Sequence, residues 1–264
     1  MRAEFRRYGR WILRLLVVVG FDPRRCYRGL KGLPFYLRDA IAYSRKKPSR
    51  SFRIRLFDCF PILDERNLAA GTAKGSYFHQ DLWAARKIYA RRPEKHIDVG
   101  SRVDGFIAHL LTFMPVSVID IRPMESEVAG LEFVQDDATR LSSFADQSVD
   151  SISSLHAAEH FGLGRYSDPV DPEACYTFMK NLERVLRPGG RLYFAVPIGR
   201  ERVEFNAHRV FSPATIVENF GRLTLVSFSA VDDDGSLHEN GDYRSLQEIN
   251  YGCGLFEFTK PVIV

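Results

Sequence analysis

From residue 76 onwards, the hydrophobic positions alternate between a helical period of three to four residues and the period of two that is typical of strands. Helices are predicted over residues 78–91, 104–113, 172–186 and 213–220. Strands are predicted over residues 95–99, 116–121, 131–135, 149–154, 191–196, 223–230 and 252–258. This alternation predicts an α/β domain with a seven-stranded, mostly parallel sheet and helices on both faces. The last two strands have no helix between them, so they predict an antiparallel C-terminal hairpin.

The first 20 residues have the pattern of a basic amphipathic helix, with apolar side chains at helical spacing and arginines opposite them. Arg14 interrupts the apolar stretch, which is too short for a membrane span of about 20 apolar residues. A peripheral, in-plane membrane contact through residues 1–20 is one hypothesis, and packing of the apolar face on the main domain is the other. Residues 45–55 are typical of a polar linker. The predicted domains are therefore an N-terminal arm over residues 1–55 and a main domain over residues 56–264.

Charge is divided unevenly between the two parts. Residues 1–50 contain 14 Lys and Arg against three acids, whereas the remainder contains 23 basic and 30 acidic residues. A basic arm predicts an anionic partner such as a membrane surface, a nucleic acid or an acidic protein. Because the main domain is acidic, we expect no nucleic-acid substrate. The four scattered cysteines have no C-x-x-C spacing, which indicates neither a disulfide framework nor a zinc cluster and favours a cytoplasmic location.

Chemistry-bearing residues follow the ends of three successive predicted strands. They are Asp98, Gly100, Ser101, Asp120, Ile121, Asp136, Asp137 and Ala138. A glycine at a strand end lets a ligand approach the backbone closely, and the N-terminus of the next helix can bind an anion. An acid after the second strand can accept both ribose hydroxyls of a nucleoside, and an acid after the third can accept a hydrogen bond from an adenine amino group. The three strand ends together predict a nucleoside pocket.

Six short motifs occur in a fixed order along the main domain. They read Asp-Val-Gly, Ile-Asp, Asp-Asp-Ala, Ser-Val-Asp, Ala-Ala-Glu-His-Phe and, over residues 184–190, Arg-Val-Leu-Arg-Pro-Gly-Gly. This order resembles the class I S-adenosylmethionine-dependent methyltransferases of the type 11 group. The resemblance implies a Rossmann-like class I methyltransferase fold and S-adenosyl-L-methionine as the cofactor.

A narrower resemblance rests on four segments, which are residues 77–83, 98–109, 119–123 and 199–202. They are similar to a bacterial family known only as domain of unknown function number 268. The similarity covers nearly all of residues 60–260. It implies the same fold and supplies no reaction.

The glycine-rich turn departs from the Gly-x-Gly-x-Gly of the type 11 group. It reads Gly-Ser-Arg-Val-Asp-Gly, and Arg102 stands where the middle glycine is expected. An arginine at this position can turn outward, pair with the methionine carboxylate of the cofactor, or fill the pocket and block it. Arg102 is therefore counted among the candidate cofactor-binding residues.

A segment rich in titratable residues follows the fourth predicted strand. His156, Glu159 and His160 match the H-x-x-E-H zinc pattern, but that pattern needs a helix and a further ligand, so no metal is predicted. We expect one of the three to face the acceptor and remove a proton from it, the alternative being that they brace the loop. His208 is a fourth catalytic candidate, with a structural role beside the next helix as its alternative. The polar loop over residues 162–169 is predicted to be an acceptor-binding lid.

The pattern as a whole predicts methyl transfer from S-adenosylmethionine to an oxygen or nitrogen of a small or glycan-like acceptor, with proximity supplying most of the rate. The alternative is a non-catalytic scaffold or binding protein that keeps the fold without the cofactor. A nicotinamide-dependent enzyme is disfavoured because G-x-G-x-x-G is absent. The expected location is cytoplasmic, with membrane association through the arm.

Overall fold

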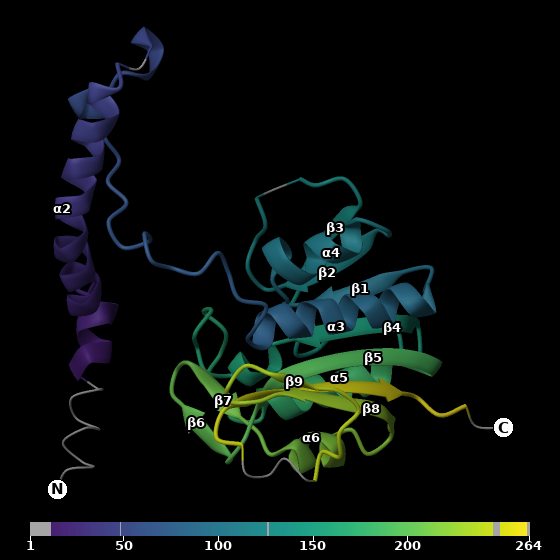
Figure 1. Ribbon diagram of the computed structural model, residues 1–264. Helices are drawn as coiled ribbons and strands as arrows, with labels where there is room; N and C mark the ends of the chain where they lie inside the picture. The colour runs from purple at the N-terminus through teal and green to yellow at the C-terminus, as the bar shows by residue number, and fades with distance from the viewer. Residues whose placement is uncertain (1–11, 48, 126, 245–248, 263–264) are drawn as a thin grey trace, which may run out of the picture. The chain divides into compact units, whose positions relative to one another are not determined.

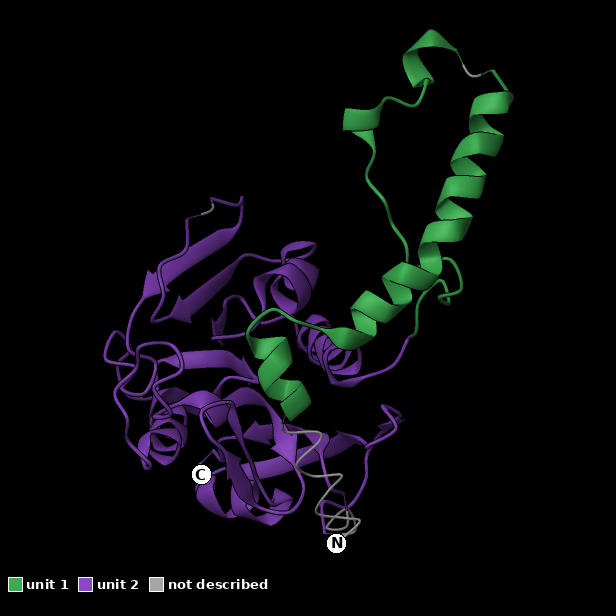
Figure 2. Cartoon of the chain, turned by 90° about the vertical axis from the view of Figure 1, so that its left-hand side faces the viewer, with its two compact units in different colours: residues 1–72 green, residues 73–264 purple. Residues whose placement is uncertain are grey.

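The computed structural model describes residues 12–47, 49–125, 127–244 and 249–262. The chain divides into two compact units, residues 1–72 and 73–264 (Figure 2). The predicted arm over residues 1–55 falls within the first unit, which continues to Thr72.

The first unit is built around helix α2 (Pro23–Arg45), which the hydrophobic pattern did not predict. Its start has a clear cause: the Asp22 carboxylate accepts hydrogen bonds from the backbone N–H groups of Arg24 and Arg25, and proline occupies the first helical position. Residues 12–18 are helical, while residues 1–11 of the predicted amphipathic helix lie outside the described residues. None of the helices in the described ranges is long and apolar enough to cross a membrane.

The second unit contains an eight-stranded sheet in the order β3-β2-β1-β4-β5-β10-β8-β9 (Figure 1). Its strands are β1 (His96–Val99), β2 (Val116–Asp120), β3 (Leu131–Gln135), β4 (Val149–Leu155), β5 (Leu186–Ile198), β8 (Thr224–Val231), β9 (Leu237–His238) and β10 (Gly252–Thr259). Strands β1 to β5 pair in parallel, whereas β10 lies antiparallel between β5 and β8. The predicted α/β fold with its antiparallel C-terminal hairpin is confirmed. A separate two-stranded sheet pairs β6 (Arg202–Glu204) with β7 (His208–Val210).

The predicted strand number was wrong by one, because the described part of the sheet has eight strands. The additional strand, β9, pairs with Ala230 and Val231 at the sheet edge. Asp232 causes this return: its Oδ1 accepts hydrogen bonds from the backbone N–H groups of Asp234 and Ser236, which closes a tight turn. Strand β9 has only two residues, which is too short to produce an alternating hydrophobic pattern.

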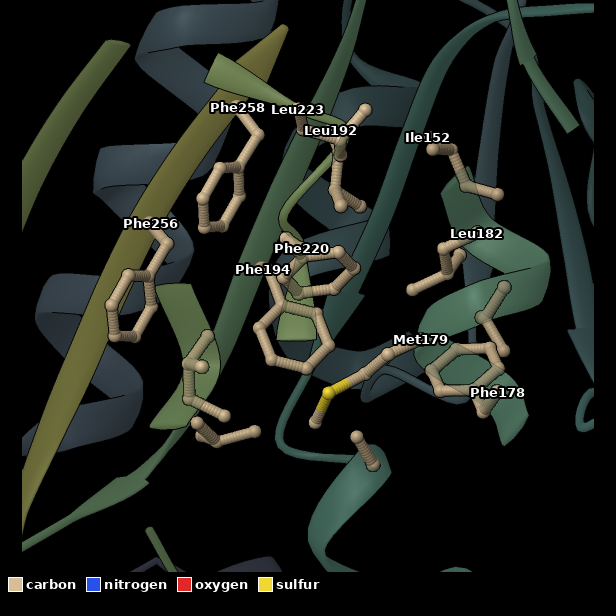
Figure 3. Packing of buried hydrophobic residues seen from close by; sticks show 14 of the residues in the cluster. Ile152, Phe178, Met179, Leu182, Leu192, Phe194, Phe220, Leu223, Phe256 and Phe258 are labelled. Atoms are coloured by element: carbon tan, nitrogen blue, oxygen red, sulfur yellow. The ribbon is translucent and has the colours of Figure 1, made fainter. Parts of the chain in front are cut away.

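Helices cover both faces of the sheet and enclose two hydrophobic cores. The larger core packs α5 (Ala174–Val185) and α6 (Pro213–Asn219) against one face (Figure 3). The smaller core packs α3 (Ser76–Arg91) and α4 (Ala108–Leu111) against the other. Strand β5 serves both, because Phe194 points into the first core and Tyr193 into the second. Two-sided burial explains the continuous apolar run over residues 192–198 of β5.

The segment after β1 differs from the single helix predicted over residues 104–113. A π-helical turn, η3 (Val103–Ile107), precedes the short α4. The wider turn buries Phe106 and Ile107 in the smaller core while the chain before it turns at Gly100.

Candidate functional site

The carboxyl ends of β1 to β4 surround a hollow of about 270 Å³, here called the first hollow. Five of the predicted cofactor-binding residues line it: Gly100, Asp120, Ile121, Asp137 and Ala138. They come from the ends of three neighbouring parallel strands, which meet at one edge of the sheet. The structure therefore brings together the residues on which the predicted nucleoside pocket depends.

Gly100 adopts a backbone conformation that favours glycine and lies close to Ala157. Its φ is +71°, in the left-handed region, and a Cβ added there would lie 2.9 Å from the Cβ of Ala157. Its N–H donates to the carbonyl of Ile119 at 3.0 Å, which ties the turn to the end of β2. A side chain at this position would both strain the backbone and enter the space beside the first hollow.

Hydrogen bonds between Asp98 and Ser101 stabilise the turn that contains Gly100. Asp98 is fully buried and accepts hydrogen bonds from the Ser101 N–H at 2.9 Å and the Ser101 hydroxyl at 2.7 Å. The Ser101 Oγ in turn accepts from the N–H of Leu155 at 3.1 Å. Burial raises the pKa of Asp98 to about 6. Asp98 lines neither the first hollow nor the larger one that adjoins it, so its contacts stabilise the turn and do not face a ligand.

The two acids after β3 point in different directions. Asp137 lines the first hollow, and its Oδ1 accepts from the backbone N–H and the hydroxyl of Thr139 at 2.9 and 2.6 Å. Its Oδ2 lies 3.8 Å from Arg140 Nε, beyond hydrogen-bond distance. Asp136 instead accepts from the hydroxyl of Ser143 at 2.7 Å and does not line the hollow.

Arg122 forms hydrogen bonds with both carboxylate oxygens of Asp120. The sequence analysis missed this contact. The guanidinium forms a two-point ion pair, with Nε 3.0 Å from Oδ1 and Nη2 2.7 Å from Oδ2. The backbone N–H of Arg122 also donates to Oδ1 at 2.9 Å. The guanidinium carbon lies 4.4 Å from the ring centre of Tyr166. The only sequence signal was the position of Arg122 in the segment Ile119–Pro123.

Arg102, the residue that replaces the expected glycine, pairs with Asp104. Its Nη2 lies 3.0 Å from Asp104 Oδ2, and its guanidinium lies 5.2 Å from the ring centre of Tyr77. The Arg102 side chain is 54% exposed. Arg102 lines a second hollow rather than the first, so its side chain leaves the space beside Gly100 and Asp137 open.

This second hollow has a volume of about 520 Å³ and adjoins the first. The two hollows share Gly100, Asp120, Arg122, His156, His160 and Tyr166. All four predicted catalytic residues line the second hollow: His156, Glu159, His160 and His208. Phe133 and three tyrosines, Tyr77, Tyr166 and Tyr251, also line it. The sequence analysis missed Tyr77 and Tyr251, because neither belongs to a strand-end motif.

Glu159, in η4 (Ala158–His160), is a buried acid without a counter-charge in hydrogen-bond range. Its side chain is 1% exposed, and its Oε1 lies 3.7 Å from His160 Nε2. Its Oε2 has no hydrogen-bond partner among the described residues. Burial raises the pKa of Glu159 to about 8, so the neutral acid is the main form at neutral pH.

The three histidines are neutral at neutral pH. Burial lowers the pKa of His156 to about 3 and that of His160 to about 4, and it also lowers the pKa of His208. His160 Nδ1 donates to the carbonyl of Ala207 at 2.7 Å, which leaves Nε2 as the nitrogen with a lone pair. His208 Nε2 has no hydrogen-bond partner within the described residues. His156 Nδ1 contacts Gln80 Oε1.

The predicted lid over residues 162–169 is ordered by one carboxylate. Asp168 accepts hydrogen bonds from the N–H groups of Gly162 at 2.8 Å and Tyr166 at 3.0 Å. Tyr166 lines both hollows. In the described ranges, no group of three or more His, Cys, Asp or Glu side chains is arranged to hold a metal ion.

A family model described as "Caenorhabditis protein of unknown function, DUF268" matches residues 120–239. This match includes the ends of β2 and β3 and the histidine segment, but it begins after the glycine turn. No curated protein matches the sequence.

Solved structures share the fold at low sequence identity. A protein of Galdieria sulphuraria, assigned as a sarcosine dimethylglycine methyltransferase, is 13% identical over 70% of this chain and 86% of its own, with a TM-score of 0.51. The [4+2]-cyclase SpnF is 14% identical over 74% of this chain and 86% of its own, also with a TM-score of 0.51. These similarities concern the fold alone. The chain has a class I methyltransferase-like fold, and its residues 120–239 are similar to the DUF268 family.

Proposed function

We propose that this protein transfers a methyl group from S-adenosylmethionine to an oxygen or nitrogen atom of a small-molecule acceptor. One observation carries the proposal: Gly100, Asp120 and Asp137 line a single hollow at the carboxyl ends of adjacent parallel strands. The methyltransferase assignment of the Galdieria protein is consistent with it. The cyclase SpnF has a similar fold, so the fold by itself does not select the reaction.

The residues of the first hollow fit an adenosyl group. Gly100 lines the first hollow without a side chain, so its backbone would be accessible to the ligand. Asp120 would accept hydrogen bonds from the ribose hydroxyls, and Asp137 Oδ2 would accept one from the adenine amino group. Arg102, at the glycine turn, would exchange its exposed partner Asp104 for the methionine carboxylate. Asp98 would keep the turn in place without touching the ligand, whereas Ser101 both holds the turn and lines the second hollow.

The residues of the second hollow fit the acceptor. When bound, S-adenosylmethionine supplies an electrophilic methyl group on a positively charged sulfur. Glu159 is neutral and can donate a hydrogen bond, whereas His160 Nε2 offers a lone pair because Nδ1 donates to Ala207. We assign proton acceptance to His208, whose Nε2 has no hydrogen-bond partner in the described part of the chain and lies 3.8 Å from Glu204 Oε2, a carboxylate that would stabilise the imidazolium. His156 lies at the junction of the two hollows and orients the loop.

A non-catalytic binding protein is the second candidate. The ion pair between Arg122 and Asp120 favours it, because that pair occupies the carboxylate that the ribose would need. The two functions separate in a transfer assay with methyl-labelled S-adenosylmethionine and the small-molecule fraction of a cell extract. Transfer of label by the wild-type chain, with strongly reduced transfer by His208→Gln, supports the enzyme. Tight binding of S-adenosylhomocysteine without any labelled product supports the binding protein.

We also propose peripheral contact of the N-terminal arm with an anionic membrane surface. Residues 12–18 are helical, and Val17, Val18 and Val19 are exposed. In α2, Leu30 and Ile41 are exposed as well. Flotation with vesicles that contain anionic lipid should recover the full chain, whereas a chain lacking residues 1–20 should stay in the bottom fraction. Equal recovery with neutral vesicles, or no loss on deletion, contradicts this contact.

A further inference from the structure

The walls of the second hollow carry three arginines, which are Arg102, Arg122 and Arg165. Two of them are already neutralised by a carboxylate: Arg102 by Asp104 and Arg122 by Asp120. Arg165 forms no ion pair with any described carboxylate. Its positive charge is therefore the one at this hollow that lacks a counter-charge within the described residues.

The guanidinium of Arg165 is held in place and still has free donors. Its Nη1 donates to the carbonyl of Ala207 at 3.0 Å and lies 3.3 Å from His160 Nδ1. Its carbon lies 5.1 Å from the ring centre of Tyr166. Nε and Nη2 make no hydrogen bond to a described residue. The free Nε–H and Nη2–H groups lie side by side on one edge of the guanidinium, an arrangement that matches two oxygens of a carboxylate or phosphate.

Two acids line the second hollow, and neither pairs with Arg165. Asp120 is paired with Arg122, and Glu159 is 1% exposed, with no hydrogen-bond partner for its Oε2 among the described residues. Burial raises the pKa of Glu159 to about 8, which keeps the acid neutral. The neighbouring histidines are neutral too, because burial lowers the pKa of His160 to about 4 and that of His208 in the same direction.

We propose that the acceptor carries a carboxylate or phosphate group, and that Arg165 binds this group through its Nε and Nη2. The nucleophilic oxygen or nitrogen of the same molecule then lies against Glu159 and His208. The rings of Tyr77 and Tyr251 contact its remaining surface. This inference rests on the proposed function, since it names the chemical class of the acceptor in that site.

The test uses the full-length chain loaded with S-adenosylhomocysteine, whose binding is measured first by calorimetry. Inorganic phosphate and acetate are then titrated at constant ionic strength, with chloride as the balancing anion. At least one of the two anions should bind in the millimolar range. Arg165→Gln should weaken that binding at least about fivefold, and Arg165→Lys should weaken it less, because lysine keeps the charge without the planar fork. The control is Arg86→Gln, an exposed arginine on α3, which should bind the anion as the wild type does.

The outcomes separate this inference from the proposed function. If S-adenosylhomocysteine binds but neither anion does, or if Arg165→Gln binds the anion as tightly as the wild type, the anionic acceptor is ruled out while the cofactor site stands. If S-adenosylhomocysteine does not bind, the proposed function fails at the first step. Loss of anion binding in Arg86→Gln to the same extent as in Arg165→Gln would show a general charge effect and overturn the assignment to Arg165.

Discussion

Arg122 and Asp120 form a two-point ion pair across the mouth shared by the two hollows, with Nη2 2.7 Å from Oδ2 and Nε 3.0 Å from Oδ1. Asp120 Oδ1 already has two donors from Arg122, its Nε and its backbone N–H, whereas Oδ2 has one. The pair also contacts the lid, because the Arg122 guanidinium lies over Tyr166. A ribose that binds Asp120 must therefore share the carboxylate with Arg122 or displace it.

Removal of the competing guanidinium should strengthen nucleoside binding. In Arg122→Met, the backbone N–H still orients Asp120 but both oxygens become more accessible. An ion pair with a half-exposed arginine is worth up to about 1 kcal/mol, so the dissociation constant for S-adenosylhomocysteine should fall by up to about fivefold. Calorimetric titration of the variant beside the wild type measures this. A dissociation constant that rises instead would mean that Arg122 contacts the ligand itself.

Gly100→Ala should harm both stability and cofactor binding. The new Cβ would meet the Cβ of Ala157 at 2.9 Å, and the left-handed backbone costs a non-glycine residue about 1–2 kcal/mol. We expect the free energy of unfolding in urea to fall by at least that amount, together with a loss of S-adenosylhomocysteine binding. Gly241→Ala is the matched control, since nothing lies within 4 Å of its added Cβ. Equal behaviour of the two variants would contradict a close approach at Gly100.

Glu159 should make the folded chain less stable as the pH rises. Burial raises the pKa of Glu159 from 4.5 in the unfolded chain to about 8, so the folded chain keeps a proton that the unfolded chain has released. Its stabilising contribution is full below the unfolded value and is lost as the pH approaches 8, at up to about 1.4 kcal/mol per pH unit. Glu159→Gln removes this loss.

The pH range for this measurement is set by the histidines. The lowered pKa values of His156 and His160 act in the opposite direction, because their contribution is present above the unfolded value of 6.5 and is lost as the pH falls. The histidines of the unfolded chain still release protons above pH 6.5, so the difference between the wild type and Glu159→Gln, measured by urea unfolding from about pH 6.5 to pH 8, isolates Glu159. The wild type should lose stability relative to Glu159→Gln as the pH rises over this interval. Parallel pH profiles for the two chains would show that Glu159 is ionised in the folded state.

The sequence predicted the sheet well because its central strands are buried on both faces and end at residues of fixed chemistry. Val99 and Ile119 are fully buried; Gly100 follows β1 directly, and Asp120 is the last residue of β2. The positions of neighbouring strand ends then follow from parallel pairing alone. Helix α2 escaped prediction although Leu30, Leu37 and Ile41 recur at helical spacing. Pro34, a residue that usually breaks a helix, lies within it.

The sequence predicted those site residues whose position is set by the end of a strand. It missed those that reach the site from a distant segment of the chain. Asp137 follows directly from β3, whereas Tyr251 reaches the second hollow from the start of β10 and carries no local signal. The contact of Arg122 with Asp120 depends on side-chain rotamers, which a hydrophobic pattern does not encode. The position of Asp98 near a strand end was predicted, but its expected contact with the cofactor was not found. Asp98 is buried and accepts three hydrogen bonds from Ser101 and Ser153.

The most direct test of the account is a calorimetric titration with S-adenosylhomocysteine of three chains: wild type, Asp120→Ala and the control Glu132→Gln, an acid on β3 that bonds Ser117 away from the hollows. The account predicts saturable binding to the wild type and to the control. Hydrogen bonds to a charged group are worth about 1.5–3 kcal/mol, so Asp120→Ala should bind roughly 10- to 100-fold more weakly. Absence of binding to the wild type at millimolar ligand, or equal affinity in Asp120→Ala, would contradict it.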